Sequence, residues 1–122
     1  MKRILIIGLI VLGFTLCALR SAPCAVLNLR ATWTANTEPD LAGYNLYRTD
    51  GTRLKINPAL ILIPAVLYNF SVTVPDNSTG TMTFVLTAVD AMGNESLDSN
   101  TASRLYDLVP PAKPIGMIIN FQ

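Results

Sequence analysis

Apolar and polar residues alternate along several segments of this chain. In residues 82–89 the apolar Met82, Phe84, Leu86 and Ala88 occupy every second position. Successive side chains of a strand point to opposite faces, so this period of two predicts a strand with one face in a core. Strands are predicted in the same way in residues 26–34, 43–48, 53–57, 68–74 and 100–108. The chain is therefore expected to be all-β.

The inward faces of these strands predict the core. Trp33 falls in phase with the apolar residues of its segment, which favours a core position over an exposed platform for a ligand. The core residues predicted with it are Tyr44, Leu46, Phe70, Phe84 and Leu86.

Turn-forming residues separate the strands. Asp50-Gly51 suits a type I′ hairpin turn, and residues 75–80, PDNSTG, are turn-forming throughout. After the strand at 82–89, Asp90, Gly93 and Asn94 predict a tight loop, because Gly and Asn accept positive φ and Asp caps backbone N–H groups.

The segment 58–67, PALILIPAVL, is apolar on all sides and contains Pro58 and Pro64. Pro64 is incompatible with a central strand at its own position. The segment is expected to cover an edge of the sheets, and the alternative is an exposed apolar patch for a partner. Its candidate contact residues are Leu60, Ile61, Leu62 and Ile63.

Residues 1–24 have the layout of a secretory signal peptide. Lys2 and Arg3 precede sixteen uncharged residues, 4–19, and small residues with a proline follow. An uncleaved membrane anchor and lipid attachment at Cys24 are the alternatives. We expect an exported protein, periplasmic, cell-envelope or extracellular, whose contact with membrane is limited to this leader.

Charge and composition exclude several functions. Three of the nine basic residues lie in the leader, which leaves six against eight acidic residues, a net charge of −2. Such a surface is not expected to bind nucleic acid. The chain has no histidine, so it lacks the usual general base and the commonest zinc ligand. We expect no enzyme activity, no catalytic residue, no metal and no cofactor.

Two segments carry a resemblance to a known family. Residues 29–48, LRATWTANTEPDLAGYNLYR, and residues 83–96, TFVLTAVDAMGNES, resemble the fibronectin type III domain of exported bacterial proteins. The resemblance spans residues 27–108 and implies an immunoglobulin-like β-sandwich of about seven strands. Together with the leader pattern, it gives the expected domain division of 1–24 leader, 25–109 sandwich and 110–122 tail. It says little about function, because such domains serve as spacers, adhesive modules or accessory domains.

The chain departs from this family at two places. Met82 stands where the family has the tyrosine of its corner motif, so that hydrogen bond is expected to be absent. Moreover, a leader cut near Ala25 leaves almost no residues for the first strand of the sandwich.

Residues 110–122, PPAKPIGMIINFQ, resemble a linker and the first strand of a following domain. Three hypotheses remain open for this tail: it folds back over its own sandwich, it hangs free, or it completes a neighbour by strand addition. Its candidate apolar contacts are Ile115, Ile118 and Phe121.

Two loops are expected at one end of the sandwich. Glu38 and Asp40 belong to the first, and Asp90, Asn94 and Glu95 to the second. Their oxygens are of the type that binds Ca²⁺, but the spacing fits no calcium loop. We expect Asp90 and Asn94 to satisfy turn backbone and Glu38 and Glu95 to face solvent.

The sequence therefore predicts a noncatalytic structural or interaction module for protein binding or surface adhesion, with an unidentified protein or cell-surface partner. Its loops and strand edges are the expected contact surfaces, and self-association through strand edges or the tail is a further expectation. The alternative is an accessory carbohydrate-binding module of a secreted enzyme system, with Tyr47 as the residue to test.

Overall fold

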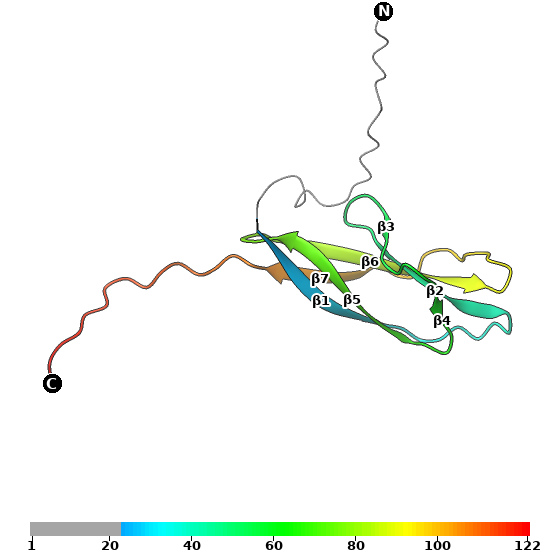
Figure 1. Cartoon of the computed structure of the whole chain (residues 1–122), viewed down its shortest axis with the longest axis horizontal. Coiled ribbons are helices and arrows are strands. Elements are labelled where there is room, and N and C mark those ends of the chain that lie inside the picture. The colour runs from blue at the N-terminus through cyan, green and yellow to red at the C-terminus, as the bar shows by residue number, and fades with distance from the viewer. Residues whose placement is uncertain (1–22) are drawn as a thin grey trace, which may run out of the picture.

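The computed structural model describes residues 23–122, which form seven strands in two sheets and no helix (Figure 1). None of these residues belongs to a helix long and apolar enough to cross a membrane. The leader predicted at residues 1–24 lies outside this range except for its last two residues. The all-β prediction is confirmed.

The smaller sheet has two strands. β1 (Cys24–Thr32) pairs antiparallel with β5 (Leu67–Pro75) along its whole length. On the outer face the Ser71 hydroxyl donates to Asn28 Oδ1 at 2.7 Å, and Arg30 Nε donates to Asn69 Oδ1 at 2.9 Å. Such cross-strand pairs hold the register of the two strands.

The larger sheet has five strands. Its centre is β2 (Leu41–Arg48) paired with β6 (Thr79–Asp90). β7 (Ala102–Asp107) extends the sheet beyond β6, while β3 (Leu54–Lys55) and β4 (Ile61–Leu62) pair with β2. All of these pairings are antiparallel.

The core lies between the two sheets. Its buried members come from β2, β4, β5 and β6: Tyr44, Leu46, Ile61, Val72, Val74, Met82 and Phe84. Phe70 of the smaller sheet meets Phe84 of the larger one edge-to-face, with ring centroids 5.3 Å apart. Trp33 meets Tyr44 in the same way at 5.1 Å. This is the packing of a β-sandwich.

The predicted core residues fall into two groups. Tyr44, Leu46 and Phe84 are buried, whereas Trp33, Phe70 and Leu86 are only half-buried. The second group faces inward as predicted but lies on the side of the sandwich beside β1, where none of the seven described strands covers it. The Trp33 indole Nε1 is buried and has no hydrogen-bond partner among the described residues.

Several strand bounds differ from the sequence-based expectation; β2 begins at Leu41 and β3 covers only Leu54–Lys55. β1 begins at Cys24, two residues before the predicted start, and β6 begins at Thr79 within the predicted turn. Val85, Thr87 and Val89 of β6 are buried as well as the residues of its inner face. The reason is that β6 is a central strand, whose outer face is covered by its neighbours.

The segment 58–67 covers the edge of β2, as the first of its two interpretations predicted. Ile61 was named as a contact residue, and this was wrong, because it pairs with Tyr44 and is buried in the core. Leu60 is half-buried and packs close to Gly43, where an added Cβ would lie 2.8 Å from Leu60 Cγ. Only Leu62 and Ile63 are exposed as proposed for a contact surface.

We predict that Phe84→Ala destabilises the fold by about 3–5 kcal/mol, because it removes a buried ring and its contact with Phe70. Leu97→Ala is the matched control, since Leu97 is 93% exposed and lies outside the core, and it should change the free energy of unfolding by less than about 0.5 kcal/mol. Urea denaturation measures both. Equal effects of the two substitutions would contradict the placement of the core.

Candidate functional site

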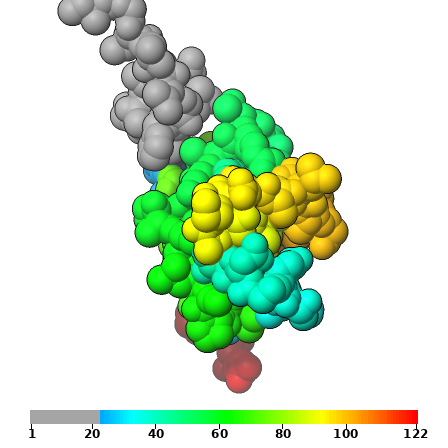
Figure 2. Space-filling view, turned by 90° about the vertical axis from the view of Figure 1, so that its right-hand side faces the viewer, coloured from blue at the N-terminus to red at the C-terminus, as the bar shows by residue number. Residues whose placement is uncertain are grey.

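The two loops predicted to share one end of the sandwich do so. Figure 2 looks onto that end, where the segment after β1 (cyan) lies beside the segment after β6 (yellow to orange). The N–H of Ala91 donates to the carbonyl of Asp40 at 2.8 Å and ties the two loops together.

Within the second loop, Asp90 and Asn94 form a closed turn. Asp90 Oδ1 accepts the backbone N–H groups of Met92 at 2.9 Å and Asn94 at 2.8 Å, and Asp90 Oδ2 accepts the Asn94 amide at 2.8 Å. Gly93 supplies the positive φ of 86° that the turn requires. These bonds, led by the Asn94 side chain, lower the pKa of Asp90. The polar groups of this turn therefore serve its own backbone, as predicted.

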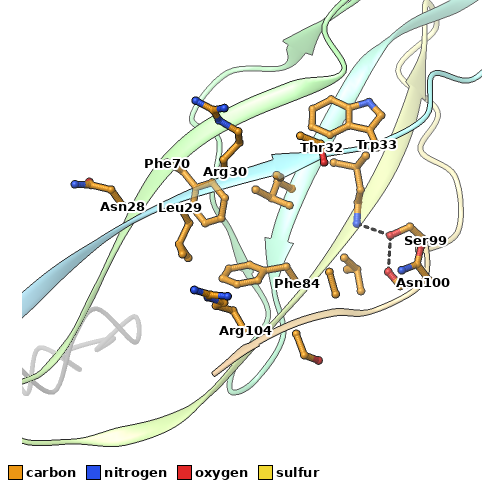
Figure 3. Close-up of a pocket in the computed structure, with 16 residues that line it drawn as sticks. Asn28, Leu29, Arg30, Thr32, Trp33, Phe70, Phe84, Ser99, Asn100 and Arg104 are labelled. Carbon is orange, nitrogen blue, oxygen red and sulfur yellow. Dashed lines mark hydrogen bonds between the residues drawn. The ribbon is translucent and has the colours of Figure 1, made fainter. Parts of the chain in front are cut away.

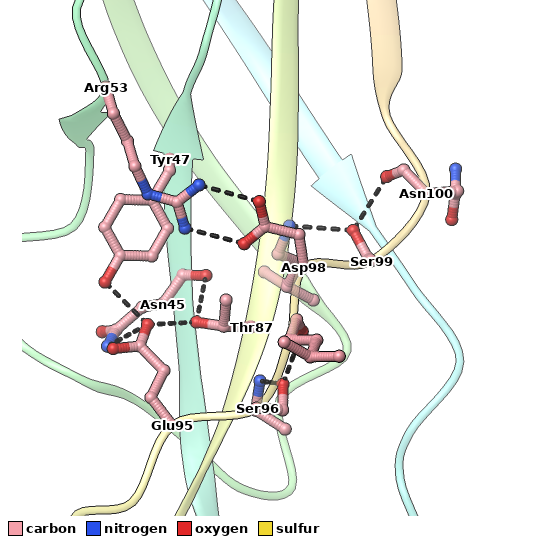
Figure 4. A network of polar contacts seen from close by, with 12 residues as sticks. Asn45, Tyr47, Arg53, Thr87, Glu95, Ser96, Asp98, Ser99 and Asn100 are labelled. Atoms are coloured by element: carbon pink, nitrogen blue, oxygen red, sulfur yellow. Dashed lines mark hydrogen bonds and ion pairs between the residues drawn. The ribbon is translucent and has the colours of Figure 1, made fainter.

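Glu95 is exposed, as predicted, but its carboxylate is also hydrogen-bonded to the larger sheet. Its Oε1 accepts hydrogen bonds from the Tyr47 hydroxyl at 2.6 Å, the Asn45 amide at 3.3 Å and the Thr87 hydroxyl (Figure 4). Charge-assisted bonds of this kind favour the ionised carboxylate. The pKa of Glu95 is lowered, first by Thr87 and then by Tyr47.

An ion pair completes this polar cluster on the outer face of the larger sheet. Arg53 binds Asp98 through two hydrogen bonds of 2.8 Å, and its guanidinium lies 4.1 Å from the centre of the Tyr47 ring. Burial and the bond to Glu95 raise the pKa of Tyr47. Because Asn45 and Tyr47 of β2 bind Glu95, the cluster connects β2 to the segment after β6.

Glu38 and Asp40 are exposed, and the sole hydrogen bond of the Glu38 side chain within the described residues is a 3.5 Å contact from Asn36. Between residues 23 and 122 no group of three or more acidic, cysteine or histidine side chains is placed to hold a metal ion. The candidate loop residues are thus near one another but do not form a common site.

A groove lies between β1 and β7, away from the polar cluster, and we call it the β1 groove (Figure 3). It has a volume of about 540 Å³. Its floor is apolar, with Leu29, Phe70, Phe84 and Leu86, and its far wall contains Ala102 and Arg104 of β7. The core is therefore reachable from outside along this groove.

The backbone of β1 borders the groove with hydrogen-bonding groups that pair with no strand of the described residues. The Trp33 N–H donates to the Val66 carbonyl and the Asp76 N–H donates to the Pro23 carbonyl, both at 3.1 Å. In an antiparallel ladder the direction of these groups alternates along the strand. Odd-numbered residues of β1 therefore face β5, and the N–H and C=O groups of the even-numbered residues point to the open edge: Val26, Asn28, Arg30 and Thr32.

Sequence reasoning did not identify this groove as a site. The sequence did predict that a leader cut near Ala25 leaves almost no residues for a first strand. The groove lies beside β1, the strand with which that first strand would pair. Ala102 and Arg104 gave no signal of their own, because a small and a charged residue in a terminal strand are typical of a solvent-exposed edge.

Comparison of the chain with protein-family models, with curated proteins and with solved structures finds no match.

We predict that the polar cluster makes stability depend on pH. The folded pKa of Glu95 is lowered, so its ionised form stabilises the fold above the unfolded value of about 4.3, and this contribution is lost as the pH falls through the folded pKa. Glu95→Gln should remove it. The difference in the free energy of unfolding between the unchanged chain and the variant should be largest near neutral pH and shrink in acid. A difference that stays constant from neutral pH to about pH 3 would contradict this role.

Proposed function

We propose that this chain is an exported, noncatalytic interaction module that binds an extended segment of a partner in the β1 groove. The observation that carries the proposal is the combination of two features at one place. The open edge of β1 offers backbone hydrogen bonds, and the groove beside it exposes apolar core residues.

Strand addition uses both features. Backbone groups of an added strand bind the edge, and alternate side chains enter the pockets beside it. The half-buried state of Leu29, Phe70 and Leu86 supports this mode of binding, because an added strand would cover them. The apolar area removed from water would then drive association.

The fold family and the export belong to the same proposal. The motifs around Trp33 and Asp90 support a fibronectin type III-like sandwich, and so does the strand layout, in which β1 pairs among the described strands with β5 alone. The leader pattern in residues 1–24 supports export. A module of this kind contributes adhesion or assembly at or outside the cell envelope.

The carbohydrate-binding alternative rested on Tyr47. Arg53 lies over the ring of this residue and its hydroxyl is bound to Glu95. A sugar that stacked on this ring face would have to displace the guanidinium from its ion pair with Asp98, so the observation does not favour that alternative.

The proposal predicts binding of peptides that form strands. A panel of fluorescent octapeptides with apolar residues at alternate positions should include members that bind the chain, as measured by fluorescence anisotropy. Ala102→Trp fills the groove and should weaken that binding by about tenfold or more. Leu105→Trp is the matched control, because Leu105 belongs to the same strand, is 76% exposed and lies outside the groove.

Two results would contradict the proposal. One is that no peptide of the panel binds, and the other is that both tryptophan variants bind as the unchanged chain does. Thermal unfolding of each variant establishes that the sandwich is intact.

A further inference from the structure

We infer that the segment which fills the β1 groove is residues 115–122 of a second copy of this chain. The inference rests on the proposed function and names its partner. Three observations carry it: the side-chain pattern of the segment, its length, and the direction in which it leaves the sandwich.

Residues 115–122 alternate in the way that an inserted strand requires. Ile115, Met117, Ile119 and Phe121 would share one face of a fully extended strand, and all four are at least 80% exposed. In the structure Gly116, between the first two, has a φ of 74°, so insertion would extend the segment at this glycine. The opposite face carries Gly116, Ile118, Asn120 and Gln122. Exposed apolar side chains on one face of a segment indicate a surface that is covered in an assembly.

The hypothesis that the tail folds back over its own sandwich does not agree with the structure. Residues 109–122 are exposed throughout and extend away from the sandwich, and they pair with no strand (Figure 1). The hydrogen bonds at the start of this segment, from Leu108 to Ser78 and from Val109 to Asp107, only close the end of β7. Within residues 23–122 the apolar face of the tail is thus left without a partner.

The lengths of the groove and the tail agree. Eight extended residues of the tail span about 26 Å, and the open edge of β1 from Val26 to Thr32 spans about 23 Å. The groove floor is apolar along this edge, from Leu29 to Trp33. The tail segment carries no charged side chain that would have to be buried there.

The direction of the chain favours the groove of another copy. β7 ends at the same end of the molecule at which β1 begins, and the tail continues outward from there (Figure 1). A strand antiparallel to β1 must enter the groove at the other end, about 30 Å away along the nine residues of β1. The linker of residues 109–114 reaches at most about 22 Å, so it is too short to return there.

A tail that continues straight meets a neighbouring copy at the correct end. It then enters the neighbour's groove running antiparallel to β1, like a missing first strand. Pro110, Pro111 and Pro114 keep the linker extended and stiff, which suits this arrangement. Each copy has one groove and one tail, so the contact is heterologous and repeats into an open head-to-tail chain.

Complementation between two defective variants tests the inference. Ala102→Trp has a filled groove and an intact tail, and Ile119→Asp has an intact groove and a charge on the inserted face of the tail. In sedimentation velocity the unchanged chain should form assemblies that grow with concentration, and each variant alone should be monomeric. A mixture of the two should form a one-to-one dimer and nothing larger.

The matched controls change the same residue types outside the contact. Ile118→Asp places the charge on the opposite face of the tail and should still assemble. Leu105→Trp should also assemble, because Leu105 lies outside the groove. Equal loss of assembly in Ile118→Asp and Ile119→Asp would overturn the inserted-strand geometry.

The remaining outcomes separate this inference from the proposed function. If the chain is monomeric at all concentrations, or if tail insertion is within one chain, the inference is overturned. The octapeptide IGMIINFQ, added to the panel of peptides used to test the proposed function, distinguishes failure of this inference from failure of the proposed function. If other peptides bind in the groove and this one does not, the inference fails and the proposed function stands. If no peptide binds, both fail.

Discussion

The structure depends on the contact between two sheets of unequal width. A two-stranded sheet covers a five-stranded one, and the apolar side chains between them form the core. Two strands are too few to cover the whole inner face of the larger sheet. The side of the core next to β1 is therefore left open. The difference in width between the sheets leaves the aromatic residues there half-buried and forms the groove that exposes them.

The opposite face of the larger sheet is stabilised by polar contacts. Asn57 is fully buried, and its Oδ1 accepts the Leu46 N–H at 2.7 Å while its amide donates to Asn45 Oδ1 at 3.0 Å. Asn45 in turn donates to Glu95. A continuous set of hydrogen bonds thus connects the centre of β2 with the segment after β6. These contacts lie away from the groove, so the proposed strand addition at β1 would leave them in place.

Much of the fold could be predicted from the sequence, because alternation of apolar residues follows directly from strand geometry. The strand positions and the inward orientation of Tyr44, Phe70 and Phe84 followed from that period. The burial of Ile61 could not be predicted, since in an unbroken apolar run every residue is equally suited to the core. The hydrogen bonds of Glu95 were also missed, because two of its donors, Asn45 and Tyr47, precede it by 50 and 48 residues in the sequence.

The open side of the core was visible in the sequence only as a shortage of residues. No pattern in β1 indicates whether its second edge is paired, because edge and central strands of a sandwich show the same alternation on their inner faces. The register of β1 with β5 determines which backbone groups of β1 point away from the sheet, and this register is a property of the folded chain.

Hydrogen exchange at the backbone amides of Asn28, Arg30 and Thr32 tests the central claim most directly, since these N–H groups point to the open edge of β1. The account predicts fast exchange in dilute protein and slowed exchange as the concentration rises, with little change at Leu27, Leu29 and Ala31, whose amides already bind β5. Strong protection of Asn28, Arg30 and Thr32 at every concentration would show that the edge is already paired within one chain and would contradict the account.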